Sequence, residues 1–179
     1  LIGSAGIVAN GIHALAIDTN SRVLYIGGWF TNGVAKWDIK NQSWINITNF
    51  EVNGPVESLL LLNNNLFIGG AFSSVSGESS PRYLNIEQWN IQSLSWDTVG
   101  AGVGNANEYF DEVFTMSNDS LGNIYVGGVF FQVDSDIHAV DIAKYNTNSK
   151  KWDSVNNSLI WNEGADAICF YKDTLYIAG

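Results

Sequence analysis

A short glycine-containing motif recurs along the chain, and it fixes the class of fold that the sequence can adopt. The motif follows a Leu-Tyr-Ile-Gly-Gly-x-Phe pattern at residues 24–30, 66–72 and 124–130, and a last, cut-off copy occupies residues 175–179. A motif that recurs at a period of several tens of residues is the signature of an array of similar structural units. We therefore expect a repeat architecture, in which each copy holds the same position in its unit.

The segments around each motif also recur. An apolar run precedes it, and an alternating segment with a central aromatic residue follows it after a polar stretch of variable length. Seven positions after that aromatic residue stands a Trp, at Trp44, Trp96 and Trp152. Short segments rich in Val, Ile, Tyr, Phe and Trp, separated by Gly, Asn, Asp and Ser, favour strands and tight turns. One unit therefore contains four short strands, and no helical periodicity of useful length is found.

Four strands in about 50 residues are typical of a propeller blade. We therefore expect an all-β fold, a β-propeller of four-stranded, kelch-like blades. The predicted blades are residues 8–50, 54–103 and 108–157, with an incomplete blade at 164–179, and residues 1–7 would end a preceding blade. About three and a half blades cannot close and would leave strand edges bare, so the sequence predicts a fragment of a larger propeller.

The paired glycines have a structural explanation. Without a β-carbon, a strand can bend, or a neighbouring blade can pack close to it. A phosphate-cradling role would need a following helix, which is not indicated. The recurring aromatic residues occupy equivalent positions in each repeat and bury a large apolar area, so we expect them to pack in the core. The single cysteine, Cys169, lies in an apolar strand, where we expect a buried small side chain.

Charge excludes two classes of partner. The net charge is −10, with only eight Lys and Arg residues. Nucleic acids and acidic membrane surfaces both require a basic face, so neither is an expected partner. No apolar run approaches the roughly 20 residues of a membrane span. No cofactor is indicated.

Four Asn-x-Ser/Thr sequons fall in or beside predicted turns or strand ends. Their asparagines are Asn41, Asn46, Asn118 and Asn156. Such positions can carry a glycan in a secreted protein. We therefore expect an extracellular or cell-surface location.

The composite pattern of residues 22–44, 66–103 and 124–152 resembles the kelch-like propeller repeats of fungal cortical polarity markers. Related repeats occur in large secreted proteins of bacteria and protists, and the superfamily includes the central domain of galactose oxidase. The resemblance implies a surface propeller used in adhesion, wall organisation or surface structure.

Enzymatic alternatives find little support in the residues. The copper chemistry of galactose oxidase needs Tyr, His and Cys ligands, but His13 and His138 lie in different predicted blades, and Cys169 occupies a repeat position. The segment 117–122 only distantly resembles the Asp box of sialidases. Glycosidases need two carboxylates, and the candidate groups are Asp134 and Asp136 with Asp141, and the adjacent pair Asp111 and Glu112. Asp134 and Asp136, which alternate in a loop, are also weak Ca²⁺ candidates, although a solvated acidic loop is the commoner outcome.

Binding specificity is usually placed in loops of variable length on a rigid scaffold. Here these are the loops between the second and third strands of each blade. The candidate interaction residues are Pro81, Arg82, Tyr83, Phe130 and Phe131. We expect a non-enzymatic surface propeller with a structural, adhesive or protein- or glycan-binding role, and with the rest of the propeller or neighbouring subunits as further partners. The alternatives are a carbohydrate-active enzyme or oxidase with catalytic residues elsewhere, and an intracellular kelch-type interaction domain.

Overall fold

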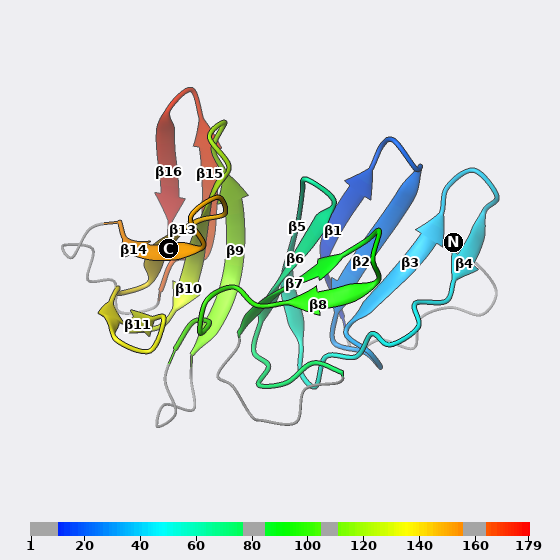
Figure 1. Cartoon of the computed structure of the whole chain (residues 1–179), viewed down its shortest axis with the longest axis horizontal. Coiled ribbons are helices and arrows are strands. Elements are labelled where there is room, and N and C mark those ends of the chain that lie inside the picture. The colour runs from blue at the N-terminus through cyan, green and yellow to red at the C-terminus, as the bar shows by residue number, and fades with distance from the viewer. Residues whose placement is uncertain (1–10, 77–84, 105–110, 156–163) are drawn as a thin grey trace.

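The computed structural model describes residues 11–76, 85–104, 111–155 and 164–179, and its regular structure in these ranges is entirely β (Figure 1). The all-β expectation is therefore confirmed. No helix capable of crossing a membrane occurs in the part of the chain that is described.

Three antiparallel sheets contain four strands each, and they follow one another along the chain. The first sheet contains β1 (Ile12–Asp18), β2 (Val23–Gly28), β3 (Val34–Asp38) and β4 (Ser43–Ile45). The second contains β5 (Val56–Leu62), β6 (Asn65–Gly70), β7 (Ile86–Asn90) and β8 (Ser95–Asp97). The third contains β9 (Glu112–Asn118), β10 (Asn123–Val129), β13 (Ile142–Asn146) and β14 (Lys151–Ser154). Each sheet pairs its strands in chain order, as the four-strand unit of the sequence predicts.

The fourth sheet is a hairpin of β15 (Ala167–Tyr171) and β16 (Thr174–Ala178). The sequence did not predict a further small hairpin, β11 (Gln132–Val133) with β12 (Ile137–His138), inside the third loop. Asp134 and Ser135 turn this hairpin with φ values of 55° and 71°. These short strands lie in a polar segment of variable composition, where a pattern of alternation is too brief to detect.

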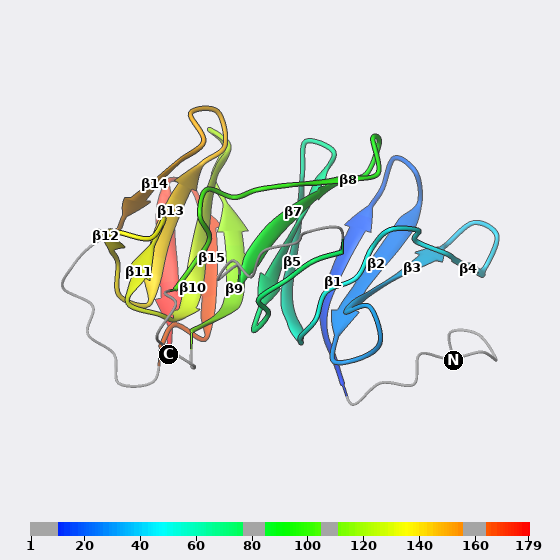
Figure 2. The same cartoon turned by 60° about the horizontal axis from the view of Figure 1, so that its bottom comes forward.

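Successive sheets lie against one another through their first strands. β5 contacts β1 and β2, β9 contacts β5 and β6, and β15 contacts β9 and β10. The strands β1, β5, β9 and β15 thus form a row, which Figures 1 and 2 show from two directions.

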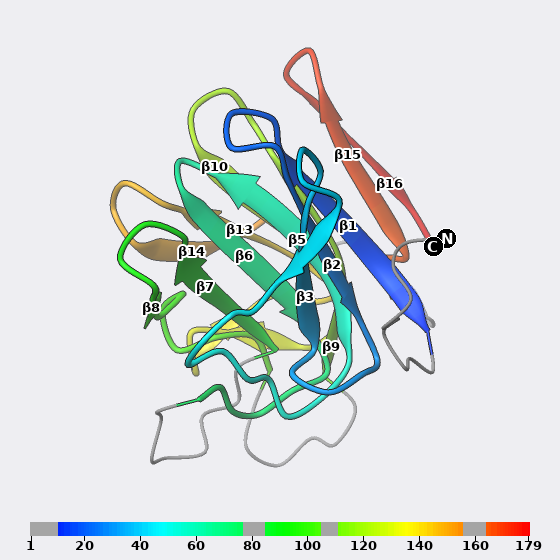
Figure 3. The ribbon, with the colours of Figure 1, turned by 90° about the vertical axis from the view of Figure 1, so that its right-hand side faces the viewer.

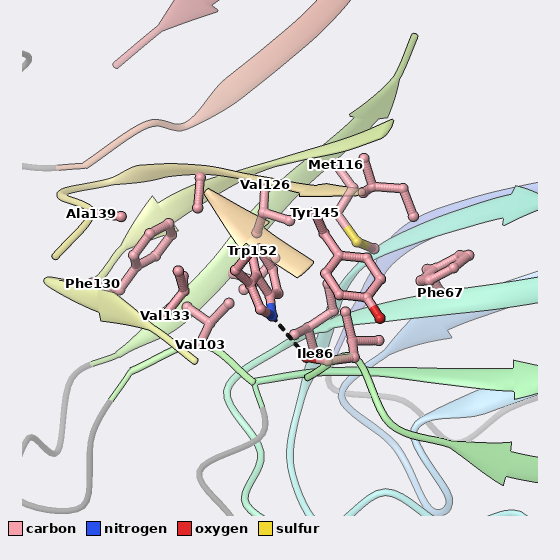
Figure 4. Packing of buried hydrophobic residues seen from close by; sticks show 14 residues of the cluster. Phe67, Ile86, Val103, Met116, Val126, Phe130, Val133, Ala139, Tyr145 and Trp152 are labelled. Atoms are coloured by element: carbon pink, nitrogen blue, oxygen red, sulfur yellow. Dashed lines mark hydrogen bonds between the residues drawn. The ribbon is translucent and has the colours of Figure 1, made fainter. Parts of the chain in front are cut away.

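Apolar clusters fill the spaces between sheets. Between the second and third sheets, the buried side chains include Phe67, Ile86, Val113, Tyr145 and Trp152 (Figure 4). The Trp152 indole Nε1 donates a hydrogen bond of 2.9 Å to the carbonyl oxygen of Val99. Trp89, Tyr145 and Trp152 are therefore core residues, as the sequence predicts. Their counterparts Trp37, Trp44 and Trp96 are only half-buried.

The two glycines of each motif meet different neighbours. A β-carbon on the first glycine would approach the next sheet: at Gly69 it would lie 2.5 Å from Val113 Cγ1. A β-carbon on the second would meet the backbone at the start of the same sheet's first strand: at Gly70 it would lie 2.1 Å from the carbonyl oxygen of Pro55, just before β5. That carbonyl lies beside an irregularity in the β5–β6 register. Close approach therefore explains both glycines, as expected from the sequence.

The turns between third and fourth strands share one device. The side chain of the last residue of the third strand accepts hydrogen bonds from backbone N–H groups two and three residues later. Asn90 Oδ1 accepts from Gln92 at 3.0 Å and from Ser93 at 2.9 Å. Asn146 Oδ1 accepts from Asn148 at 3.0 Å and from Ser149 at 2.9 Å. Asp38 Oδ1 similarly accepts from the Asn41 N–H at 2.8 Å. Asx side chains stabilise tight turns in this way, which fixes the recurring seven-residue interval.

Candidate functional site

The loops that join the second and third strands emerge on one side of the row of sheets, the lower side in Figure 1. Two large apolar side chains project from them: Trp29 is 57% exposed and Phe131 is 56% exposed. We call the described loop segments 29–33, 71–76 and 130–141 the loop rim.

A common frame closes these loops despite their different lengths. In each unit, the residue before the third strand donates its N–H to the carbonyl oxygen of the motif phenylalanine. These bonds run from Gly33 to Phe30 at 2.9 Å, from Asn85 to Phe72 at 3.0 Å and from Asp141 to Phe130 at 3.0 Å. The residue before the third strand has a positive φ in each unit, of 71°, 41° and 60° in the same order. The loop tips can therefore vary while their bases stay fixed.

The phenylalanine of this frame anchors the loop in the core. Phe72 and Phe130 are buried, Phe130 completely. Phe130 was a candidate interaction residue, but it is not at the surface and packs in the cluster of Figure 4. Its place in the repeated motif could have signalled this burial. Phe131 remains an exposed candidate, whereas Pro81, Arg82 and Tyr83 lie outside the described residues.

The two Ca²⁺ candidates have different surroundings. Asp134 is half-buried, and its Oδ1 accepts a hydrogen bond of 2.7 Å from the Ala101 N–H, so it ties the β11–β12 turn to the segment after β8. Asp136 is exposed. Within the described ranges, no three His, Cys, Asp or Glu residues gather as a metal site would require.

The sequons differ in accessibility. Asn41 is exposed in the β3–β4 turn, where its Nδ2 donates to Asp38 Oδ2 at 2.7 Å, and Asn46 is exposed just after β4. Asn118 is half-buried at the end of β9, and its Nδ2 donates to the Asp119 carbonyl oxygen at 3.1 Å. Asn156 lies outside the described residues. Asn41 and Asn46 are therefore the accessible acceptors among the described sequons.

A polar groove of about 370 Å³ separates the outer parts of the second and third sheets. Its lining includes Gln88, Trp96, Asp97, Tyr145 and Lys150. Asp97 Oδ2 accepts hydrogen bonds from Lys150 Nζ and Gln88 Nε2, both at 2.9 Å. Partial burial acts to raise the pKa of Asp97, but hydrogen bonds, chiefly the one from Lys150, lower it by more. The pKa of Asp97 therefore lies below its usual value. Burial, and next the Asp97 charge, raise the pKa of Tyr145 to about 12.

The corresponding groove between the first and second sheets is mostly apolar. It encloses about 190 Å³, and its lining includes Tyr25, Ile45, Phe50, Trp89 and Leu94. Leu94 stands in the β7–β8 turn at the place that Lys150 takes in the β13–β14 turn. Equivalent positions thus carry different chemistry, so these grooves, like the loops, vary on a constant frame.

Three titratable side chains near the starts of the first strands, His13, Glu57 and Glu112, interact electrostatically. His13 Nδ1 contacts the Glu57 carboxylate. Burial, and next the charge of Glu57, raise the pKa of Glu112, while His13 partly offsets them. Sequence reasoning paired Glu112 with its neighbour Asp111 instead. The grouping needs the register between three sheets, which no local pattern contains.

The remaining candidates stay apart. His138 is exposed on β12, far along the chain from the contact that His13 makes with Glu57. Cys169 is exposed, contrary to the expected burial. Its neighbours Ile168 and Phe170 point to the covered side of β15 instead, since side chains alternate along a strand.

The chain matches no family model and no curated protein. Solved structures share its fold at low sequence identity. U3-55K has a TM-score of 0.60 and 11% identity over 92% of this chain and 43% of that one. The extracellular domain of BT4673 from B. thetaiotaomicron, described as a hybrid two component system, has a TM-score of 0.61 and 15% identity over 96% of this chain and 19% of that one.

The computationally designed Ika4 protein has a TM-score of 0.57 and 14% identity, and the match covers 99% of this chain and 96% of that one. The chain thus spans less than half of U3-55K and about a fifth of the BT4673 chain, whereas it spans nearly all of Ika4. At such identities the likeness concerns the fold alone.

Proposed function

We propose that the repeated sheets are blades of a kelch-like β-propeller, and that this propeller is a non-enzymatic scaffold outside the cell or at its surface. The loop rim is its binding surface for a protein or glycan partner.

The blade interpretation is supported by three features together. Each sheet pairs its strands in chain order, successive sheets meet through their first strands, and glycines allow that close contact. A radial array of four-stranded sheets uses these same features.

The hydrogen bond that closes the base of each loop is the observation on which the proposed binding role rests. Loops of different length rest on one hydrogen-bonded frame, with a phenylalanine inserted in the core in two of the three units and half-buried in the first. A scaffold that keeps its loop bases fixed can vary the tips without loss of stability, which is how rigid folds carry recognition.

The exposed aromatic side chains give the rim its contact chemistry. Trp29 and Phe131 leave more than half of their surface open to solvent. Aromatic side chains contribute large contact areas at the centres of interfaces and also stack on the apolar faces of sugars. Both partner classes are therefore compatible with the rim.

The surface location is supported by the two exposed sequons. Asn41 lies in the β3–β4 turn, away from the loop rim at the other end of β3, whereas Asn46, just after β4, lines a pocket together with Thr31 and Asn32 of the rim. A glycan at Asn41 would leave the rim accessible.

A glycan array and a panel of immobilised cell-surface proteins test the binding role. We expect the wild-type chain to bind at least one class of probe, and the Trp29→Ser/Phe131→Ser variant to lose that binding at unchanged thermal stability. Leu121→Ser is the matched control, because Leu121 is 74% exposed but lies in the β9–β10 turn. Equal binding by both variants would refute the rim as the binding surface.

A further inference from the structure

The polar groove between the second and third sheets lies apart from the loop rim. The second sheet lines it with Asn65, which begins β6, and with Asn90, which ends β7, whereas the rim lies at the opposite ends of these strands. The third sheet contributes Thr147 and Lys150 of the β13–β14 turn. Figure 3 shows this turn on the same side of the chain as the β7–β8 turn.

Both walls of the groove belong to sheets that have a neighbour on each side. The second sheet contacts the first and the third, and the third contacts the second and the fourth. The groove is therefore bounded by described residues, and it does not lie on an outer face of the row of sheets.

The contact between the first and second sheets shows that the fold does not require a polar lining here. The groove at that contact is smaller, at about 190 Å³ against about 370 Å³. At three equivalent positions of strand register and turn it has Ile45, Ile91 and Leu94 in place of Asp97, Thr147 and Lys150, respectively. An exposed ion pair such as that of Asp97 with Lys150 adds little stability, so the packing of the sheets does not account for the polar side chains.

The charges within the groove cancel. Asp97 and Lys150 are the charged side chains of its lining, and their carboxylate oxygen and ammonium nitrogen lie 2.9 Å apart. This pair leaves no charge for an ion of either sign to neutralise, and the net charge of −10 further opposes an anion. A neutral ligand therefore suits the groove better than an ion.

The walls have more hydrogen-bond donors than their own contacts use. Gln88 Nε2 and Lys150 Nζ each donate one bond to Asp97 Oδ2. Asn90 Nδ2 donates one bond, of 3.0 Å, to Asn65 Oδ1. A side-chain amide has two N–H donors and an ammonium group has three, so all three donor groups can bind a further acceptor.

Tyr145 forms the floor between these walls. It is buried in the apolar cluster of Figure 4 and also lines the groove. A ligand that carries several hydroxyl groups on an apolar carbon ring matches polar walls over an aromatic floor, because hydroxyl groups both donate and accept hydrogen bonds.

We propose that this groove binds a neutral sugar residue, either as a free sugar or at the end of a glycan. Its volume of about 370 Å³ lies within the range of roughly 300–1,000 Å³ that is usual for small-ligand sites. Such sites are mostly apolar, so the polar walls here select a ligand rich in hydroxyl groups. The inference depends neither on the loop rim nor on the location of the protein.

An NMR titration of the ¹⁵N-labelled chain tests the site. The probes are glucose, galactose, mannose and N-acetylglucosamine, each as the free sugar and as its methyl glycoside. A ligand of about 12 non-hydrogen atoms, the size of a hexose, is expected to bind with a Kd of about 2 mM. We expect at least one probe to cause saturable shifts of the side-chain amide signals of Gln88 and Asn90. A methyl glycoside that binds as well as the free sugar identifies the end of a glycan as the ligand, whereas its rejection identifies a free sugar.

Two variants test the two walls separately. Thr147→Ile/Lys150→Leu gives the third-sheet wall the residues that stand at these places in the groove between the first and second sheets, and should weaken sugar binding about tenfold. Lys40→Leu is the matched control, because it removes the same charge from the exposed β3–β4 turn, and it should bind as the wild type does.

Ser95→Trp fills the groove from the second sheet. Ser95 is exposed and lines the groove, so this change leaves the contact of Asp97 with Lys150 in place. We expect loss of sugar binding at an unchanged melting temperature, which distinguishes direct contact with the ligand from an effect on the packing of the sheets.

Four results would overturn the proposal. They are the absence of saturable shifts with every probe, shifts confined to the Trp29 indole of the loop rim or to the groove between the first and second sheets, wild-type binding by Ser95→Trp, and tighter binding of glucuronate than of glucose. The last result would show that the groove selects an anion. Shifts at Trp29 alone would support the loop rim as a binding surface while rejecting this groove.

Discussion

The paired glycines of β10 allow a quantitative test of how the sheets are built. Gly127 and Gly128 are adjacent, and replacement by Ala adds the same methyl group to each. At Gly128 the new β-carbon would lie 2.0 Å from the carbonyl oxygen of Glu112. At Gly127 it would lie 2.9 Å from Thr115 Cγ2 and 3.1 Å from the β-carbon of Ala165.

The difference between these neighbours sets the expected cost. A carbon and an oxygen in contact need about 3.3 Å, so Gly128→Ala must displace the β9 backbone by about 1 Å. The displacement disturbs the pairing of Glu112 with Val129, worth about 1 kcal/mol, and adds overpacking of about 2 kcal/mol. Gly127→Ala meets side-chain atoms that can shift, and costs about 1 kcal/mol.

Thermal and urea unfolding, followed by tryptophan fluorescence, would measure both variants. A loss of about 3 kcal/mol lowers the melting temperature by about 9 °C for a chain of this size, and a loss of 1 kcal/mol lowers it by about 3 °C. The fourth unit already has Ala178 at the place of Gly127. A cost for Gly127→Ala equal to or above that of Gly128→Ala would refute this explanation of the pair.

Three further predictions concern single side chains. Phe130→Ala should cost about 3–5 kcal/mol in urea unfolding, because Phe130 is fully buried, whereas Phe131→Ala should stay within about 0.5 kcal/mol. Burial of Asp119 acts to raise its pKa, but hydrogen bonds, led by the one from Asn123, hold the pKa below 3.8. Ionised Asp119 therefore adds stability above pH 3.8, and this stability is lost as the pH falls through the lowered pKa. Asp119→Asn should therefore destabilise at pH 7, and the difference from wild type should shrink in an acid titration. The raised pKa of Glu112 means that its ionisation lowers stability as pH rises from 4.5, so Glu112→Gln should raise the melting temperature at pH 7 and leave it unchanged well below pH 4.5.

The strands of the repeat were predictable because their signals are local. Alternating apolar residues mark the strands, and the seven-residue interval before Trp44, Trp96 and Trp152 marks a hairpin of constant length. Its Asx turn needs only residues that are neighbours in the chain.

The burial of particular side chains was harder to predict, since it depends on whether another sheet covers the face. Cys169 lies in an apolar strand like its counterparts, yet it is exposed because its side of β15 has no sheet against it in the described structure. The contact of His13 with Glu57 joins two sheets and leaves no local pattern. For the loops, the sequence indicated which segments join the second and third strands, but not which of their side chains reach solvent.

Glycopeptide mass spectrometry of the native protein tests the proposed surface scaffold most directly. The account predicts hexosamine-bearing peptides at Asn41 and Asn46, which are exposed, and an unmodified Asn118, whose side chain is half-buried and bonded to the Asp119 carbonyl. Unmodified asparagines at both Asn41 and Asn46 would contradict a surface location and favour an intracellular interaction domain.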